Sequence, residues 1–326
     1  MEIKFLKAGK GDAILIQYNR HNILIDGGDD YTYLRQELID ILKKDECLDL
    51  VIVTHHDEDH IAGIIELVKE VKEGVYGESL DFIKKIIFNS PKAIITAIKA
   101  PDYLSYKQAK CLNDLLTCIK CEHVIGYQGL PSLQYGALEI DIIAPFEEEL
   151  KNYAQNTKAL LAGGRNCDWN NSLKELEPYC DDNSLDSSPS NRTSIVCIIR
   201  FENKQILLSG DTTPDILTIA LNDWALNHSL KFDLMKLPHH GSYRNISNQL
   251  LDLIDCNKYV IMTNGKNSCL PDKKAFLKIL KWRKSKNTEF YFNYNEVISS
   301  LNFPLEELKT FNFSLHTPNN SNGYYY

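Results

Sequence analysis

The sequence predicts an α/β fold in which strands and helices alternate and pack in layers. Short apolar runs, typical of buried strands, recur along the chain, and segments with a helical spacing of apolar residues lie between many of them. Turn signals join other neighbouring runs as hairpins. The composition agrees with this class, because 44% hydrophobic and 25% charged residues are ordinary values for a globular protein.

The first half of the chain opens with two expected hairpins. The expected strands are residues 2–6, 13–17, 23–25, 50–53, 82–88 and 138–144, and the expected helices are residues 33–44, 61–72 and 105–120. Turn residues at 9–12 and 26–28 separate strands, and the glycines of the second turn allow positive φ and a close approach to the segment at 54–60. Residues 73–80 are polar and contain glycine, so we expect a loop there, near the mouth of a site formed by the segment at 54–60.

A polar interruption divides the two halves of the chain. Residues 146–190 are rich in polar and small side chains and predict a surface insertion, either a lid over the site or a linker between the halves. Beyond it, strands are expected at 194–200, 205–208, 232–237 and 258–262, and helices at 214–226, 246–254 and 273–281. Residues 317–326 lack a regular pattern, so we expect a flexible tail.

Charge, cysteines and hydropathy narrow the class of protein. Nine cysteines, an odd number scattered along the chain, indicate reduced thiols and a cytoplasmic location. We expect no membrane contact, because no apolar run approaches the ~20 residues that span a bilayer and no secretory signal is visible. The net charge of −8 gives no basic footprint for broad nucleic-acid binding, although bound metal ions can supply local positive charge to a nuclease.

The central feature of the sequence is the segment VIVTHHDEDH at residues 51–60. An apolar strand ends there, and three histidines and three acids follow within six residues. Such a cluster cannot be buried unless its charges are neutralised, and a divalent cation does this directly. As an extended segment it places His55, Asp57 and Asp59 on one side, and His60 opens the next helix. The alternative is a polar loop in which Asp59 caps that helix.

Several motifs resemble those of one known family and occur in the same order. Thr54-His55-x-Asp57-x-Asp59-His60 is similar to the signature His-x-His-x-Asp-His of the metallo-β-lactamase superfamily, and the Asp in the second ligand position resembles the ComEC branch, the hydrolase-like domain of bacterial DNA-uptake channels. Further segments similar to that branch are FLKAGKGDAILI (5–16), NILIDGG (22–28), LLSGD (207–211) and LPHHGS (237–242). The resemblance covers about residues 1–265 and leaves the substrate open.

The resemblance implies an αββα sandwich, which we expect to be a single domain over residues 1–326 with two divalent metal ions, zinc or manganese, at one edge of the sheets. His55 and Asp57 would hold the first ion, Asp59, His60 and His240 the second, and Asp211 would bridge them. A hydroxide between the ions would be the nucleophile, with Asp59 and Asp211 as the catalytic carboxylates. Asp211 has an alternative role as the cap of the helix at 214–226.

The first ion position departs from the family pattern. Asp57 replaces a histidine, and the third histidine expected between the two halves is missing, because His123 is the only one between His60 and His228 and it precedes the last strand of the first half. Asn191, in a stretch similar to the Asn-x-x-Ser of ComEC-like proteins, is either a weak ligand or substrate contact, or a turn residue before a strand. The first site is therefore either open and oxygen-rich, which suits manganese, or filled only when substrate binds, whereas zinc suits the second site.

Two further candidates lie beside the expected ligands. Asp26 would orient a ligand histidine, or would simply form the turn before Gly27. Neighbouring side chains of an extended segment point to opposite faces. The resemblance therefore assigns His240 to the metal and leaves His239 to hydrogen-bond or to contact substrate.

Three more side chains are candidates for contacting a phosphate group. Ser242 either contacts phosphate or belongs to a Gly-Ser turn. Arg192 and Arg244 are candidate clamps, because guanidinium matches phosphate geometry, and their alternative is an ordinary surface position.

Three functions fit the sequence. The first is a metal-dependent phosphodiesterase or nuclease acting on a phosphodiester, which includes nucleic acid. The second is a hydrolase of a small-molecule ester, thioester or lactam, because the same nucleophile attacks carbonyl groups. The third is an effector or accessory subunit that works with a partner protein in a bacterial system, for example anti-phage defence, which rests on analogy alone. Assays on nucleic acid, a model phosphodiester and a carbonyl ester separate the first two, and activity that needs a partner indicates the third.

Overall fold

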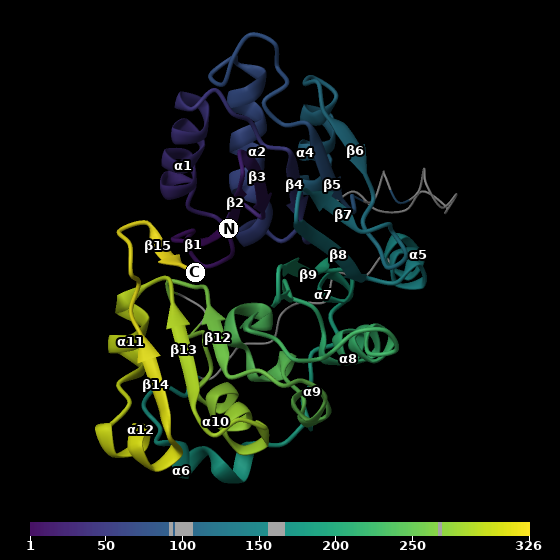
Figure 1. Cartoon of the computed structure of the whole chain (residues 1–326). Coiled ribbons are helices and arrows are strands. Elements are labelled where there is room, and N and C mark those ends of the chain that lie inside the picture. The colour runs from purple at the N-terminus through teal and green to yellow at the C-terminus, as the bar shows by residue number, and fades with distance from the viewer. Residues whose placement is uncertain (91–93, 95–106, 156–166, 267–268) are drawn as a thin grey trace.

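Two β-sheets packed face to face form the centre of the molecule, as a computed structural model of the chain shows (Figure 1). The structure describes residues 1–90, 94, 107–155, 167–266 and 269–326. Within these residues one sheet has the strand order β15-β1-β2-β3-β4-β5-β6 and the other has the order β14-β13-β12-β11-β10-β9-β8-β7. The strands of the first sheet are β1 (Glu2–Leu6), β2 (Ile14–Tyr18), β3 (His21–Ile25), β4 (Leu50–Val53), β5 (Lys85–Phe88), β6 (Glu122–Val124) and β15 (Gly323–Tyr325). The strands of the second sheet are β7 (Leu133–Tyr135), β8 (Leu138–Ala144), β9 (Val196–Phe201), β10 (Lys204–Leu208), β11 (Leu234–Lys236), β12 (Lys258–Ile261), β13 (Thr288–Phe292) and β14 (Phe313–His316).

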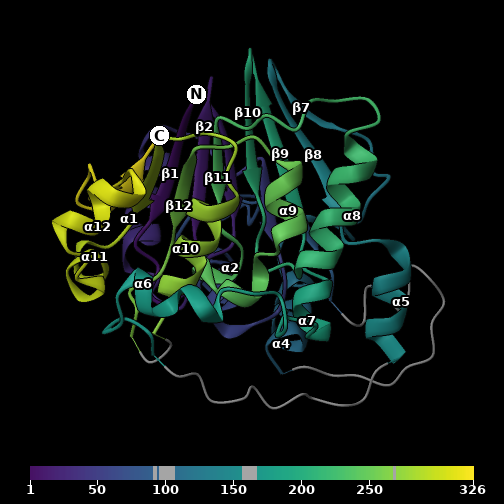
Figure 2. The ribbon, with the colours of Figure 1, turned by 90° about the horizontal axis from the view of Figure 1, so that it is seen from below.

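Helices cover the outer face of each sheet. The first sheet carries α1 (Thr32–Lys43), α2 (Glu58–Lys72) and α4 (Lys107–Leu116), whose apolar faces share one buried cluster with its strands. The second carries α8 (Pro214–Trp224), α9 (Asn248–Leu253), α10 (Lys273–Trp282), α11 (Asn295–Leu301) and α12 (Leu305–Phe311). Figure 2 shows α8, α9 and α10 lying side by side across the second sheet. In the part of the chain that the structure describes, no helix is both long and apolar enough to cross a bilayer.

The alternation of side chains in each strand separates the layers. In β4, Val51 and Val53 face the helices, whereas Leu50 and Ile52 face the other sheet and pack with residues such as Ile206 and Leu208 of β10. All of these side chains are almost completely buried. The four layers are therefore helix, sheet, sheet and helix, and the predicted αββα sandwich is confirmed.

The flexible tail expected at residues 317–326 is wrong. Residues Gly323–Tyr325 form β15, which pairs antiparallel with β1, so the two chain ends lie close together (Figure 1). Glu37 of α1 fixes the strand, because its Oε1 accepts hydrogen bonds from Tyr325 Oη at 2.6 Å and Asn322 Nδ2 at 2.9 Å. Lys4 Nζ donates to the other oxygen of Glu37 at 2.7 Å.

The surface insertion expected at residues 146–190 is packed structure over much of its described length. It contains α5 (Glu147–Gln155), α6 (Leu173–Leu176), η1 (Glu177–Tyr179) and α7 (Pro189–Arg192), while residues 156–166 of the expected lid lie outside the described residues. Leu173 and Leu176 are buried in the core cluster of the second sheet, and Trp169 Nε1 donates to Pro271 O at 2.8 Å. This part of the chain is polar on average, but a few of its apolar side chains pack into the core.

The loop at residues 73–80 does not lie near the site. It follows the carboxyl end of α2, and the residues of that helix beyond His60 separate it from the histidine-rich segment by about 18 Å. Figure 1 shows it beyond the far end of α2.

Candidate metal centre

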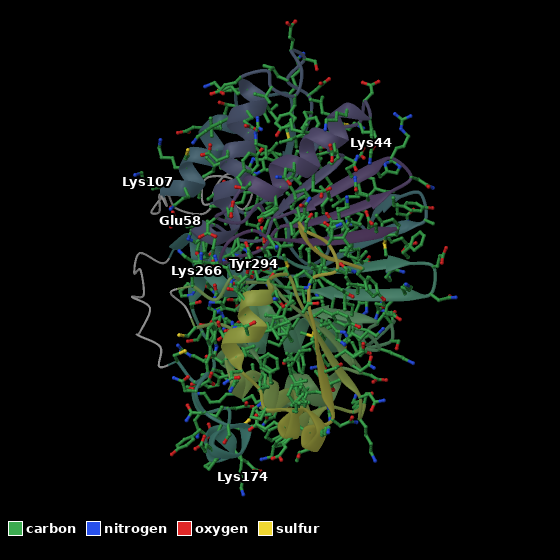
Figure 3. All side chains as sticks on the ribbon, turned by 90° about the vertical axis from the view of Figure 1, so that its left-hand side faces the viewer. Lys44, Glu58, Lys107, Lys174, Lys266 and Tyr294 are labelled. Atoms are coloured by element: carbon green, nitrogen blue, oxygen red, sulfur yellow. The ribbon has the colours of Figure 1, made fainter. Side chains whose placement is uncertain are left out.

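The predicted ligands meet at one edge of the two sheets. Strand β4 runs parallel to β3 and β10 runs parallel to β11, so the residues that follow these strands emerge at common edges. A backbone hydrogen bond of 2.9 Å from Ile195 N to Thr54 O joins the two sheets beside the ligands. In Figure 3 the labelled Glu58, Lys266 and Tyr294 lie at the level where the two halves of the molecule meet, whereas Lys44 and Lys174 lie toward opposite ends.

The histidine-rich segment is only partly extended. Helix α2 begins at Glu58 with Asp57 in the N-cap position, so Asp59 and His60 belong to its first turn. The expectation that the helix starts at residue 61, with Asp59 as cap and three ligands alternating on an extended segment, is therefore wrong. His60 is still directed into the protein, because the first turn of α2 packs against the turn after β3, where Gly27 N donates to His60 O at 2.8 Å. A Cβ at Gly27 would lie 2.5 Å from Ile64 N, so this close approach requires glycine.

Asp26 links the end of β3 to the ligand segment. It is completely buried, accepts hydrogen bonds from Thr54 N at 2.7 Å and Thr54 Oγ1 at 2.6 Å, and lies 2.8 Å from His60 Nδ1. A carboxylate only accepts, so Nδ1 of His60 carries the proton and its Nε2 atom is left for a ligand. This contact is the one expected from the sequence.

The carboxylate of Asp211 lies close to three imidazole rings. Its Oδ1 is 3.4 Å from His60 Nε2, and its Oδ2 is 3.3 Å from His240 Nε2 and 3.9 Å from His239 Nε2. The backbone N–H of Asp211 donates to Ser194 Oγ, and Pro214–Trp224 has Thr213 rather than Asp211 at its N-cap position. The geometry thus differs from that of a helix cap.

The segment with His239 and His240 is a tight turn and not an extended strand. Both residues have positive φ, 47° and 55°, which is uncommon for any residue but glycine, although asparagine, aspartate and histidine adopt it more often than the rest. His240 Nδ1 lies 2.9 Å from Met262 O and donates to it, so Nε2 faces the cluster and lies 3.4 Å from Asp59 Oδ2. The two imidazoles consequently approach the same carboxylate, against the expectation that they point to opposite faces.

His55 and Asp57 form the other side of the cluster. His55 Nε2 is 3.6 Å from Asp57 Oδ2, and Ser190 Oγ donates to Asp57 Oδ1 at 2.7 Å. His56, the middle histidine of the segment, instead contacts the hydroxyl of Tyr153 in α5, with 2.8 Å between Oη and Nδ1. Burial lowers the pKa of His56 to about 4, so this imidazole is neutral at ordinary pH.

Two charged residues that the sequence reasoning missed lie beside these ligands. Lys236, the last residue of β11, is completely buried, and its Nζ pairs with Asp12, lies 2.9 Å from Gly210 O and lies 3.5 Å from Asp211 Oδ1. Burial would lower the pKa of Lys236, but the charges of Asp12 and Asp211 outweigh it and raise the pKa. Asp12 also lies 3.3 Å from His240 Nδ1, the nitrogen turned away from Asp59. We interpret Asp12 as a support for Lys236 and His240, because its carboxylate already neutralises an ammonium group.

The carboxylates and imidazoles strongly perturb each other. Burial would lower the pKa of His60 and of His240, but Asp211 and the other nearby carboxylates outweigh it and hold both values well above the usual range. Burial would raise the pKa of Asp59, but a hydrogen bond from His240 and the charge of His60 lower it. Such mutual perturbation is typical of functional sites.

The cluster has the chemistry of a divalent-cation site. Asp12, His60, Asp211 and His240 each offer an atom within 4.8 Å of the others. Buried atoms without a hydrogen-bond partner include His55 Nε2, Asp211 Oδ1 and Asp12 Oδ1 among the residues that the structure describes. Unpartnered buried acceptors are costly, and a bound cation satisfies them. The residues present therefore fit bound metal.

The remaining predicted site residues have structural partners. Arg192 pairs with Glu149 at 2.7 Å and with Asp215 at 2.5 Å, so its guanidinium joins α5 to α8, and the phosphate-clamp interpretation is not supported. Arg244 Nε donates to Ser184 O at 2.9 Å. Buried Ser242 belongs to the turn after His240, where its N–H donates to His239 O, in agreement with the turn alternative.

Asn191 lies between two residues of the site. Its Nδ2 donates to Asp186 Oδ2 at 2.6 Å and lies 3.3 Å from His239 Nδ1. Asp186 and Asn245, which also contact each other at 2.9 Å, were missed in the sequence, since one lies in the polar interruption and the other beyond the LPHHGS motif.

A protein-family model and two curated proteins each match part of the chain. Residues 6–85, which include Asp26 and the histidine-rich segment, match the family model of the Metallo-beta-lactamase superfamily. Among curated proteins, microtubule-associated protein 1A of Rattus norvegicus and of Mus musculus are each 26% identical over an alignment of 198 residues, and the match covers 48% of this chain and 7% of the length of those relatives.

Solved structures that the chain is distantly similar to include the metallo-β-lactamase fold protein YhfI from Bacillus subtilis, with 14% identity, a TM-score of 0.44 and coverage of 100% of this chain and 98% of that chain. Zinc-bound PqqB from Methylobacterium extorquens has 10% identity, a TM-score of 0.46 and coverage of 100% and 99%. The family match at residues 6–85 and the four αββα layers together identify the fold as that of the metallo-β-lactamase superfamily.

Proposed function

We propose that this protein is a metal-dependent hydrolase that cleaves phosphodiester bonds. The observation that carries the proposal is the buried carboxylate of Asp211, which faces the Nε2 atoms of three imidazoles and has one oxygen without a hydrogen-bond partner. A carboxylate in this position suits two cations held close together, because it offsets their mutual repulsion. The proposal takes no support from microtubule-associated protein 1A, because the match spans only 7% of that protein.

The residues divide into two ligand groups around Asp211. Asp59, His60 and His240 would hold one ion, and His55 and Asp57 would hold the other. Bound divalent ions lower the pKa of water toward neutrality and neutralise charge on the attacking and leaving oxygens of an in-line displacement. Asp57, an Asp that this chain shares with the ComEC-like pattern, makes the group of His55 and Asp57 rich in oxygen, which suits manganese. The histidines around Asp59 suit zinc.

The protein's own residues fix the ligands before substrate arrives. Asp26 holds His60 by its Nδ1 atom, and Met262 O does the same for His240. Ser190 holds the carboxylate of Asp57. Such contacts set the tautomer and the direction of each ligand, and removing them typically weakens metal affinity by about 10–100-fold.

The test compares a model phosphodiester, single-stranded DNA, RNA and a carbonyl ester as substrates, with zinc or manganese added. We expect the natural protein and Glu58→Gln to hydrolyse bis(p-nitrophenyl) phosphate at similar rates. The rate should fall by more than about 100-fold in Asp59→Asn, because removing a metal ligand weakens metal binding more than removing a residue that orients a ligand. Glu58 is the matched control, since it is an exposed acid in the same turn of α2. Turnover of the ester alone would contradict the substrate class, and no turnover of any substrate by the metal-loaded protein would contradict the proposed activity.

A further inference from the structure

One ion position has only two protein ligands besides the shared Asp211 if only the motif residues are counted. His55 and Asp57 share that position with Asp211, and the sequence between His60 and His228 offers only His123 as another imidazole. His123 lies in β6, where its Nε2 is 2.9 Å from Phe88 O. It is therefore used within the first sheet and does not complete the position.

The turn after β11 brings a second imidazole to Asp211. His239 and His240 both adopt positive φ, and their rings lie 5.8 Å apart with an angle of 80° between the planes. Their Nε2 atoms lie 3.9 Å and 3.3 Å from the same atom, Asp211 Oδ2. Two successive histidines in the left-handed region cost of order 1–3 kcal/mol each, and such strain persists where the surrounding structure demands it.

A polar cradle fixes the direction of the His239 ring. Asn245 Oδ1 lies 3.1 Å from His239 Nδ1, and Asp186 Oδ2 lies 3.8 Å from the same nitrogen. Asp186 in turn accepts hydrogen bonds from Asn191 and Asn245. The acceptor Asn245 Oδ1 at 3.1 Å is nearer to Nδ1 than the amide nitrogen of Asn191 at 3.3 Å, and that amide already donates to Asp186 at 2.6 Å. We therefore assign the proton to Nδ1, which directs the lone pair of Nε2 toward Asp211. A carboxylate or amide oxygen behind one nitrogen is the usual environment of a metal-binding histidine.

Helix α7 contacts both Asp57 and the ring of His239. Ser190 of α7 donates to Asp57 Oδ1, and its neighbour Asn191 contacts both His239 and Asp186. The same short helix therefore supports a ligand from the histidine-rich segment and the His239 ring. Asp59 instead approaches His240 at 3.4 Å and His60 at 4.0 Å.

We propose that His239 is the missing protein ligand, so that His55, Asp57, His239 and Asp211 hold one ion while Asp59, His60, His240 and Asp211 hold the other. The inference rests on the proposed two-ion hydrolase and deepens it. It gives the two histidines of the LPHHGS motif equivalent roles in different ion positions. It also gives Asp186, Asn191 and Asn245 one purpose, which is to orient His239.

The test measures how many ions bind, independently of activity. Metal-free protein is titrated with Co²⁺ by equilibrium dialysis, and the visible absorption of the bound ion is recorded. The variants are His239→Gly and His240→Gly, in which glycine accommodates the positive φ without strain. His123→Ala is the matched control for loss of an imidazole outside the site. The melting temperature of each metal-free variant shows whether it folds, and His239→Asn, which also tolerates positive φ, replaces His239→Gly if that variant does not fold.

We expect two ions per chain in the natural protein and in His123→Ala, and one ion in His239→Gly and in His240→Gly, with the lost position weakened by more than about 100-fold. Free imidazole should restore the second ion in His239→Gly, because it can enter the space left by the ring. Two ions in His239→Gly with unchanged affinity would overturn the inference and leave the proposed function intact. One ion or none in the natural protein would overturn the two-ion centre itself, and the inference with it.

Discussion

The carboxylate of Asp26 and the imidazole of His60 are joined by a buried contact of 2.8 Å between Oδ2 and Nδ1. The same carboxylate receives two hydrogen bonds from Thr54, so it connects the end of β3, the end of β4 and the first turn of α2. His60 Nε2 consequently faces Asp211 from a fixed direction.

We predict that Asp26→Asn lowers metal affinity by about 10–100-fold without unfolding the protein, because the amide keeps the shape and the positive φ of Asp26 but is a poorer acceptor from imidazole. Metal titration by calorimetry measures the change. Asp29→Asn, an exposed acid of the same turn, serves as the control and should bind metal like the natural protein. Equal affinities in the two variants would show that Asp26 only shapes the turn.

A second prediction concerns the buried ion pair of Asp12 and Lys236. Removing one partner leaves the other charged and buried, so Asp12→Asn and Lys236→Met should each cost about 3–5 kcal/mol of unfolding free energy. The double variant should cost clearly less than the sum of the two. Denaturant unfolding of the metal-free proteins gives the coupling energy.

The same measurement on the exposed ion pair of Glu66 and Lys69 on α2, with two single variants and the double variant, provides the comparison. Its coupling should stay below about 1 kcal/mol, since solvent screens the charges. Additive effects at Asp12 and Lys236 would mean that the two charges do not depend on each other in the folded protein.

The ligand segment and the layered fold are predictable because their signals are local. The acids and histidines of the ligand segment follow directly after the strand at residues 50–53. Asp211 and His240 likewise follow within a few residues of the strands that precede them. The family resemblance adds the pairing of the two halves, which local patterns do not contain.

Other features depend on contacts between distant residues. The strand β15 forms because Tyr325 and Asn322 reach Glu37, almost 290 positions away, and nothing near residue 325 signals this. Asp12 sits in a sequence that reads as a simple turn, and its role depends on Lys236 from the other sheet. The tight turn at His239 is likewise set by Met262 and Asn245 rather than by its own residues.

A third prediction tests the packed part of the polar interruption. Leu173 is completely buried against the second sheet, so Leu173→Ala should lower the unfolding free energy by about 2–5 kcal/mol. Leu305→Ala removes the same atoms from a side chain that is 74% exposed and should change stability by less than about 0.5 kcal/mol. If both variants were equally stable, residues 167–190 would be a surface loop, as the composition alone indicates.

A fourth prediction concerns pH and the C-terminal strand. Burial would raise the pKa of Glu37, but hydrogen bonds from Lys4, Tyr325 and Asn322 outweigh it, so the pKa lies below its ordinary 4.5. A carboxyl group with a lowered pKa stabilises the fold above its unfolded value, and this contribution disappears as the pH falls through the folded value. Glu37→Gln should therefore cost about 1–3 kcal/mol at neutral pH and progressively less below pH 4.5.

Denaturant unfolding at a series of pH values checks this dependence, with the exposed Glu66→Gln as a control that should show little effect at any pH. A cost of Glu37→Gln that stayed constant down to pH 2 would contradict the role of the charged carboxylate.

The central claim is that Asp211 lies between two divalent ions, and anomalous scattering from crystals grown with zinc or manganese tests it most directly. The account predicts two peaks about 3.5–4 Å apart, one beside Asp59, His60 and His240 and one beside His55 and Asp57, with an oxygen of Asp211 at each. Crystals in which the cluster shows no anomalous peak, or in which Asp211 contacts neither ion, would contradict it.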